Sequence, residues 1–230
     1  MKEMQDHGLI LSMLSALLDY PDQALLDALP EIRDTVASHA ALPPATRTSL
    51  CELVDYLDRA NLLGLQEAYV ATFDRGRNTS LYLFEHVHGE SRDRGQAMVD
   101  LLAMYEKSGL FLGARELPDY LPVFLEFAAH EPAKRARSLL GEVADINRTI
   151  ATHLAQQGNR YAAAVAALLP LAGESPLSND VWVAPREKDN APIDTEALDK
   201  EWQDEPVSFL NAQAPTQDQP VKFYPARPPQ

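Results

Sequence analysis

Cysteine is almost absent from this chain of 230 residues, in which Cys51 is the only one. A single thiol excludes an internal disulfide and any metal or iron–sulfur site built from several cysteines. Cys51 lies among apolar residues with helical spacing, where a small core residue is a simpler interpretation than a nucleophile. Such cysteine usage is typical of a protein from a reducing compartment.

Basic charge is also scarce, since 20 Lys and Arg stand against 34 Asp and Glu, for a formal net charge of −14. Phosphate binding needs a basic face, so this balance argues against nucleic acid and against an anionic membrane surface as partners. It favours a basic partner instead.

Long apolar runs are missing, because no stretch approaches the roughly 18 consecutive apolar residues of a membrane span. The N-terminus has neither a basic region nor a small-residue cleavage pattern, so it does not resemble an export signal. We therefore expect a soluble, cytoplasmic protein with no direct membrane insertion.

Helical periodicity fills the first 172 residues, and no segment shows the alternation of a strand. We predict helices over residues 9–18, 22–40, 50–57 (after Pro43-Pro44), 65–73, 91–108, 119–128, 132–154 and 161–170. Gly109 is placed to end its helix in the left-handed region, Asp119 to cap the next one, and Pro170 to end the last.

The fold class predicted from these patterns is all-α, a multi-helix bundle over residues 1–172. Its two halves, about 1–108 and 119–172, are joined by a connector that contains glycine and proline, Gly109–Pro118. We found no internal repeat.

Composition changes after residue 172, because residues 174–230 contain 9 of the 17 prolines and 11 acids against 5 bases. Such a segment buries too little apolar area to offset its ordering entropy, so 173–230 is predicted to be a largely disordered acidic tail. Trp202 lies in an apolar island at 198–209, and docking of this island and continued mobility remain equal alternatives.

The stretch Phe73–Gly95 differs from the rest of the body in its density of charge. Its central apolar run is Leu81–Phe84, and around it stand four bases and four acids: Arg75, Arg77, Arg92, Arg94, Asp74, Glu85, Glu90 and Asp93. Equal numbers of both signs favour internal ion pairing over anion binding. The stretch either holds the two halves together or meets a partner.

His86 and His88 are the only candidates for metal chemistry. On a helix, residues two apart point to opposite sides, and no third histidine has a matching spacing. Nucleophile elbows and glycine-rich phosphate loops are absent too. We therefore predict no catalytic residue, metal or cofactor, and histidines that are hydrogen-bonded or face a partner. A metal-dependent helical enzyme using this pair, and a general helical adaptor, are the alternatives.

Several runs of this sequence resemble one family. Residues 73–77 and 83–98, extended by 115–119 and by 198–207 in the tail, are similar to the delta-subunit type of respiratory nitrate reductase assembly chaperones. These belong to the all-helical redox-enzyme maturation chaperones. The matching motif residues are Asp74, Arg75, Arg77, Glu85, His86, His88, Glu90, Arg92, Asp93, Arg94 and Pro118.

This resemblance implies a client-specific chaperone and no enzyme. Its partner would be the N-terminal segment of the apo catalytic (alpha) subunit of nitrate reductase, with molybdenum cofactor delivery proteins as further partners. The chaperone would keep that subunit competent for insertion of the molybdenum cofactor and an iron–sulfur cluster before membrane docking. Relatives carry histidine where this chain has Tyr120, which leaves the role of that position open.

The candidate residues for binding the client peptide combine aromatic rings with acids at the connector: Tyr69, Phe73, Tyr82, Phe84, Glu116 and Asp119. A groove between helices binds an amphipathic partner, and an acidic surface steers a basic one. For each ring taken singly, ordinary core packing is the competing interpretation. The tail island at 198–209 is predicted to fold over the body and compete with the client.

Overall fold

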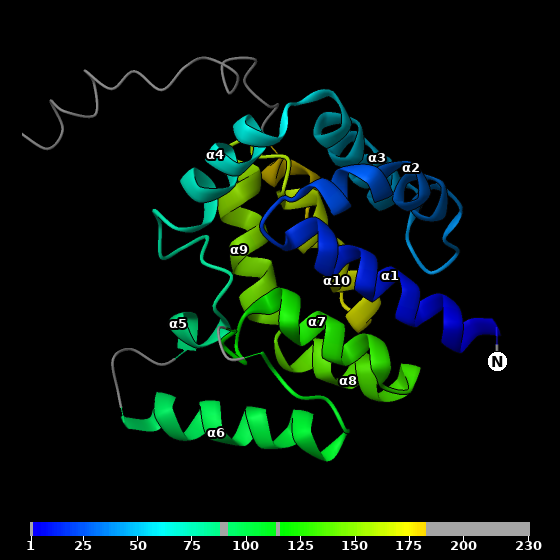
Figure 1. Ribbon diagram of the computed structural model, residues 1–230. Coiled ribbons are helices and arrows are strands. Elements are labelled where there is room, and N and C mark those ends of the chain that lie inside the picture. The colour runs from blue at the N-terminus through cyan, green and yellow to red at the C-terminus, as the bar shows by residue number, and fades with distance from the viewer. Residues whose placement is uncertain (1, 88–91, 114–115, 183–230) are drawn as a thin grey trace, which may run out of the picture. The chain divides into compact units, whose positions relative to one another are not determined.

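The protein is helical in the computed structural model, which describes residues 2–87, 92–113 and 116–182 and places side chains from residue 7 onward, except those of residues 92 and 93 (Figure 1). The helices are α1 (Lys2–Leu18), α2 (Gln23–Ser38), α3 (Pro44–Arg59), α4 (Leu62–Phe73), α5 (Leu83–Val87), α6 (Arg92–Lys107), α7 (Leu121–His130), α8 (Ala133–Glu142), α9 (Ala144–Gln156), α10 (Ala162–Ala172) and the 3-10 helix η1 (Asn179–Val181). Over these ranges there is no strand, only a bridge between Tyr82 and Tyr120. The predicted all-α class is confirmed.

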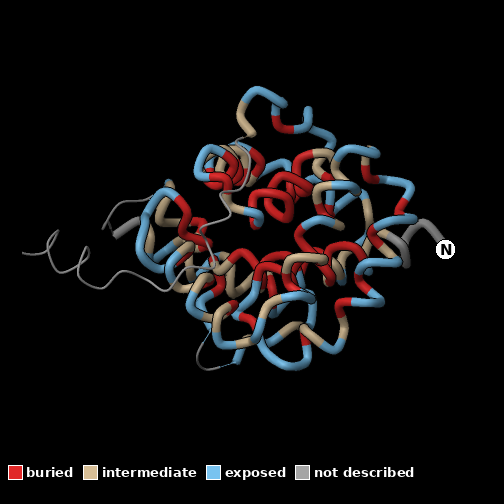
Figure 2. Tube along the Cα trace, turned by 90° about the horizontal axis from the view of Figure 1, so that it is seen from above, coloured by how far each residue is buried: buried red, intermediate tan, exposed pale blue. Residues whose placement is uncertain are grey.

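The core is built around α10, whose sequence is apolar on every side. Ala162 through Leu169 and Leu171 are all buried, as expected of a helix with no polar face. Helices α3, α8 and α9 pack against it, and buried residues concentrate on the inward sides of the surrounding elements (Figure 2). Among the described helices, none is both long enough and apolar enough to cross a bilayer.

Helix α1 packs along α7 at short range. A Cβ atom on Gly8 would lie 2.7 Å from the carbonyl oxygen of Ala129, so glycine permits this approach. The buried Ser15 hydroxyl donates to the carbonyl of Pro122 at 2.7 Å. Elements from before and after the connector therefore share one core, and all of the described helices belong to one compact unit. The tail boundary at 173 and the island at 198–209 stay predictions, because residues 183–230 lie outside the described residues.

Local interactions close two of the helix ends. The Asp22 carboxylate accepts a hydrogen bond from the backbone N–H of Leu25 at 2.8 Å and so caps the start of α2. At the end of α6, Gly109 takes a φ of 81°, and the N–H of Leu110 bonds to the carbonyl of Tyr105 at 3.0 Å. This is the predicted left-handed ending.

Two predicted helix boundaries are wrong. The helix expected over 132–154 is divided at Val143, which has φ −108° and ψ 9°, into α8 and α9. The apolar spacing runs across the break because it records which face is buried and not whether the backbone is continuous. Nor does Pro170 end α10, which continues to Ala172 and stops at Gly173 with a φ of 88°. In a last turn the missing N–H removes one bond only.

Two backbone hydrogen bonds join the start of α5 to the residues that directly follow the connector. The N–H of Leu83 donates to the carbonyl of Asp119 at 2.9 Å, and the N–H of Leu121 donates to the carbonyl of Leu81 at 2.8 Å. These two bonds hold the starts of α5 and α7 side by side. The charged stretch and the end of the connector therefore lie next to each other, and the candidate site is formed where they meet.

Candidate functional site

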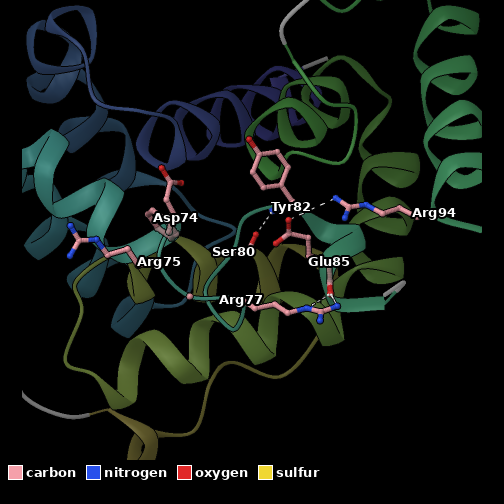
Figure 3. Close-up of a pocket in the computed structure, with 9 residues that line it drawn as sticks. Asp74, Arg75, Arg77, Ser80, Tyr82, Glu85 and Arg94 are labelled. Carbon is pink, nitrogen blue, oxygen red and sulfur yellow. Dashed lines mark hydrogen bonds and ion pairs between the residues drawn. The ribbon is translucent and has the colours of Figure 1, made fainter. Parts of the chain in front are cut away.

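Two adjoining cavities open where α4 ends and the connector passes. The larger, here called the charged cleft, measures about 450 Å³ (Figure 3). Its lining residues are Phe73, Asp74, Arg75, Gly76, Arg77, Ser80, Tyr82, Glu85 and Arg94. The smaller, here called the aromatic pocket, measures about 180 Å³. Its lining residues are Tyr20, Tyr69, Phe73, Asp74, Leu81, Tyr82 and Tyr120. Three residues are common to both, so the cavities form one trough.

A tight turn after α4 shapes the floor of the trough. Helix α4 ends at Phe73, and its C-cap Asp74 still has a helical φ of −97°. The buried Thr79 hydroxyl then lies 2.6 Å from the carbonyl of Thr72 and donates to it, while the N–H of Thr79 bonds to the carbonyl of Gly76 at 3.2 Å. The chain therefore folds back on the helix end and displays Asp74, Arg75 and the residues after them at the surface.

The charged cleft is only partly paired internally. The Arg94 guanidinium lies 3.8 Å from a carboxylate oxygen of Glu85, and Arg77 donates to the backbone carbonyl of Glu85 at 3.0 Å. Figure 3 shows the two arginines approaching Glu85 from different sides. Internal ion pairing is thus confirmed for Arg94 and Glu85. Asp74 and Arg75 are exposed and make no ion pair within the described part of the chain.

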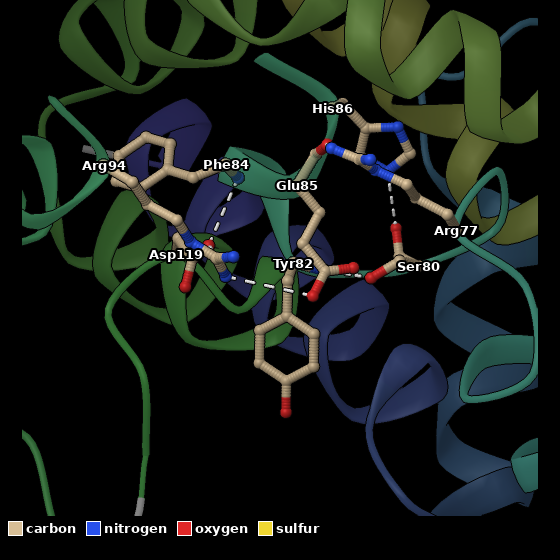
Figure 4. Close-up of polar contacts among 8 residues, drawn as sticks. All are labelled: Arg77, Ser80, Tyr82, Phe84, Glu85, His86, Arg94 and Asp119. Atoms are coloured by element: carbon tan, nitrogen blue, oxygen red, sulfur yellow. Dashed lines mark hydrogen bonds and ion pairs between the residues drawn. The ribbon is translucent and has the colours of Figure 1, made fainter. Parts of the chain in front are cut away.

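Asp119 is fully buried at the meeting point of α5, α6 and α7. Its Oδ2 accepts a hydrogen bond from the N–H of Phe84 at 3.2 Å and lies 3.9 Å from the Arg94 guanidinium (Figure 4). Its Oδ1 has no hydrogen-bond partner among the described residues. Burial raises the pKa of Asp119, and the Phe84 N–H and Arg94 only partly oppose that shift.

The predicted role of Asp119 as the side-chain cap of α7 is therefore wrong. The residue at the N-cap position is Tyr120, and no side chain caps α7. The Asp119 carboxylate instead binds the backbone of Phe84, 35 residues away. A local capping pattern could not reveal a partner so distant in the sequence.

On the aromatic side, tyrosine hydroxyls connect three segments of the chain. The Tyr69 hydroxyl lies 2.8 Å from the carbonyl of Leu18 and 2.6 Å from the Tyr120 hydroxyl. Tyr120 in turn donates to Asp19 at 3.1 Å. Burial raises the pKa of both Tyr69 and Tyr120, so both rings stay neutral at physiological pH. Tyr120 thus acts here as a neutral hydrogen-bonding ring.

The six candidate peptide-binding residues fall into different places. Tyr69 and Phe73 are largely buried but line the trough, and half-buried Tyr82 lines both cavities. Phe84 is half-buried against the core, Asp119 lies beneath the surface, and Glu116 is exposed; none of these three lines either cavity.

The candidate and motif residues chosen from the sequence did not include five residues that line the cavities: Tyr20, Gly76, Ser80, Leu81 and Tyr120. Tyr20 offered one signal, because it is a large aromatic residue directly before the proline that follows α1.

His86 forms a structural hydrogen bond at this site. His86 Nε2 lies 2.8 Å from the carbonyl oxygen of Ser80, so this nitrogen carries the proton that is donated (Figure 4). The expected hydrogen-bonded histidine is confirmed for His86, whereas His88 and Glu90 lie outside the described residues. Within the described ranges, no three His, Cys, Asp or Glu residues are grouped so that they could hold a metal ion.

Comparison with known proteins gives a consistent result. The family model described as "Nitrate reductase delta subunit" matches residues 39–167. The chain is 45% identical over 201 residues to "Nitrate reductase molybdenum cofactor assembly chaperone NarJ" of Escherichia coli (strain K12), covering 87% of this chain and 84% of the relative.

Two further relatives carry similar names. The chain is 42% identical to "Probable nitrate reductase molybdenum cofactor assembly chaperone NarW" of the same organism, over 89% of this chain and 85% of that protein. It is 34% identical to the probable NarJ chaperone of Bacillus subtilis (strain 168), over 71% and 88% respectively. Of the residues that line the two cavities, all except Tyr20 fall inside the range of the family model.

Proposed function

The chain belongs to the nitrate reductase delta subunit family, and from this we propose that it is a chaperone for the maturation of a respiratory nitrate reductase. The observation that carries the proposal is the 45% identity, over 87% of this chain, to a protein named as a molybdenum cofactor assembly chaperone. Such a chaperone acts by binding and catalyses no reaction.

The proposed client is the apo catalytic subunit, held by its N-terminal segment in the cytoplasm. While bound, the subunit stays competent to receive the molybdenum cofactor and an iron–sulfur cluster, and it docks at the membrane only afterwards. Cofactor delivery proteins would meet the same complex. The chaperone then leaves, so a dissociation constant of about 1 μM, or about −8 kcal/mol, suits the transient complex.

We assign the client segment to the trough formed by the charged cleft and the aromatic pocket. Its lining offers rings for apolar contacts and exposed charges for orientation, as peptide-binding grooves do. The exposed Asp74 and Arg75 are available to a partner because neither is committed to an ion pair within the described residues. The net charge of −14 would raise the association rate of a basic segment.

Co-purification tests this proposal. The full-length chain carrying an affinity tag is produced together with the catalytic subunit, once in cells that make the molybdenum cofactor and once in cells that cannot. We expect capture of the catalytic subunit, with much more recovered from the cofactor-deficient cells, and loss of capture when the N-terminal segment of that subunit is deleted. Equal absence of the catalytic subunit in both samples would contradict the proposal.

A further inference from the structure

The aromatic pocket has an unusual lining. Five of its seven lining residues carry aromatic rings, one is the carboxylate Asp74, and none is basic. Three pairs of these rings are in contact: Tyr20 and Tyr69 lie edge to face with centroids 5.6 Å apart, Tyr69 and Phe73 lie 4.7 Å apart, and Tyr82 and Tyr120 lie 5.2 Å apart. Ring faces carry negative electrostatic potential, so such a pocket favours a cation.

Carboxylates strengthen that preference. The exposed carboxylate of Asp74 belongs to the lining, and the Asp19 carboxylate accepts a hydrogen bond at 3.1 Å from the hydroxyl of Tyr120, which is another lining residue. The pKa of Tyr82 reports the local field: burial raises it most, and the negative charges of Asp74, Asp119, Glu85 and Asp19 raise it further. Four acids thus act on the ring that lines both cavities.

The described part of the chain supplies no cation to this pocket. Arg75, Arg77 and Arg94 line the charged cleft and not the aromatic pocket. A contrast is offered by Tyr56, where the Arg160 guanidinium lies 5.2 Å from the ring centroid. There the fold completes its own cation–π contact, whereas among the described residues the aromatic pocket is left for a cation from outside.

Size narrows the choice of ligand. The pocket measures about 180 Å³, below the range of roughly 300–1,000 Å³ usual for small-molecule sites. It therefore suits a single side chain. An apolar side chain would fill the space, but it would also strip water from Asp74 without neutralising that charge. A basic side chain gains both the ring faces and the carboxylate.

We propose that the aromatic pocket binds one lysine or arginine side chain of the client segment and so fixes the register in which that segment lies along the trough. This rests on the proposed function, since it names the group that the same trough recognises. Asp74 provides the counter-charge, and Tyr20 and Tyr82 provide ring surface. The neighbouring charged cleft, with three arginines, would then receive the acidic or carbonyl-rich part of the segment.

A double-mutant cycle tests this inference with the full-length chain. The probe is a synthetic peptide of the first 30 or so residues of the nitrate reductase catalytic subunit, together with versions in which each lysine is replaced by norleucine and each arginine by citrulline. We expect Asp74→Asn to weaken binding of the unmodified peptide about tenfold, equivalent to about 1.4 kcal/mol. One of the neutralised peptides should bind the wild-type chain as weakly as the unmodified peptide binds Asp74→Asn. The affinity of that neutralised peptide should not fall further when Asp74→Asn replaces the wild-type chain.

Asp34→Asn is the matched control, because Asp34 is exposed on α2, away from both cavities, and the substitution removes the same charge. It should change affinity less than about twofold, for every peptide alike. Tyr20→Leu removes a ring from the lining and should act like Asp74→Asn, selectively on the peptide that keeps its basic residue. Thermal unfolding of each variant shows whether the substitution leaves the fold intact.

The peptide-binding measurements distinguish failure of the pocket proposal from failure of the proposed chaperone function. If the wild-type chain binds the peptide but Asp74→Asn and Asp34→Asn weaken it equally, or if no neutralised peptide loses affinity, the basic side chain does not occupy the pocket. If the wild-type chain binds none of the peptides, it does not recognise the N-terminal segment, and both the proposed client and the proposed occupant of the pocket are wrong.

Discussion

The core around α10 and the trough beside α4 follow opposite rules. In the core, apolar side chains from α1, α3, α8 and α9 surround α10, a helix of mostly alanine and leucine, and they are largely buried. In the trough, the exposure of the rings ranges from buried Tyr69 to exposed Tyr20. Within the described ranges, Asp74 and Arg75 lack ion-pair partners, and one carboxylate oxygen of the buried Asp119 has no hydrogen-bond partner. The apolar contacts that stabilise the fold are concentrated in the first region, whereas the second exposes charged groups that have no ion-pair partner among the described residues.

The strongest way to break this comparison is a cavity in the core. Leu14 on α1 is fully buried, so Leu14→Ala should lower the free energy of unfolding by about 2–5 kcal/mol, measured by chemical denaturation. Leu63→Ala, on α4 but largely exposed, is the control and should stay within about 0.5 kcal/mol of the wild type. Equal losses at both positions would remove the distinction between core and surface leucines.

The second test uses the buried charge under the trough. Burial raises the pKa of Asp119 above its ordinary 3.8. The folded protein therefore binds its proton more tightly than the unfolded chain, so the free energy of unfolding falls as pH rises from 3.8 through the raised pKa. Asp119→Asn keeps an acceptor for the Phe84 N–H and cannot ionise, so it should gain stability relative to the wild type over that window.

Denaturant titrations at a series of pH values, with Asp34→Asn as the control, measure this difference. A wild-type protein that becomes more stable relative to Asp119→Asn as pH rises would show that the ionised carboxylate is favoured in the fold.

The third test sharpens the description of the α1 and α7 contact. Gly8→Ala places a Cβ 2.7 Å from a backbone carbonyl oxygen that cannot move cheaply. Its strain outweighs the better helix propensity of alanine, for a net loss of about 1 kcal/mol. Gly141→Ala on α8 meets nothing within 4 Å and should gain about 0.5 kcal/mol. Thermal unfolding of both variants checks the difference in sign, and a gain in Gly8→Ala would refute close packing there.

The smallest effect is expected at the rim of the charged cleft. Arg94 and Glu85 are separated by 3.8 Å and partly exposed, so Glu85→Gln should cost less than about 1 kcal/mol. The loss should shrink further at 1 M salt, where charges are screened. Glu31→Gln, exposed on α2, is the control. A loss above about 2 kcal/mol that salt does not change would mean that this pair is part of the core.

The sequence predicted the helical core better than it predicted the trough. Helical periodicity, Gly109 and the apolar character of α10 are local signals, and the structure bears them out because each acts over a few residues. The apolar periodicity did not predict the break at Val143, because a buried face can continue across an interrupted helix.

The architecture of the trough depends on contacts between distant segments. No local pattern could predict that Leu83 and Leu121 would bond to the opposing segments, or that Asp119 would bind the N–H of Phe84 instead of capping α7. The charge density of 73–95 did predict where the charged cleft lies. It did not predict that Tyr20, from the end of α1, would complete the aromatic lining.

The most direct test of the central claim is hydrogen exchange of the full-length chain, with and without the cofactor-free catalytic subunit. If the trough binds the client, exchange should slow at residues 74–87 and 119–121 on complex formation, while α9 and α10, already protected in the core, should exchange as slowly as before. A complex that leaves the trough segments unchanged and protects another face instead would contradict the account.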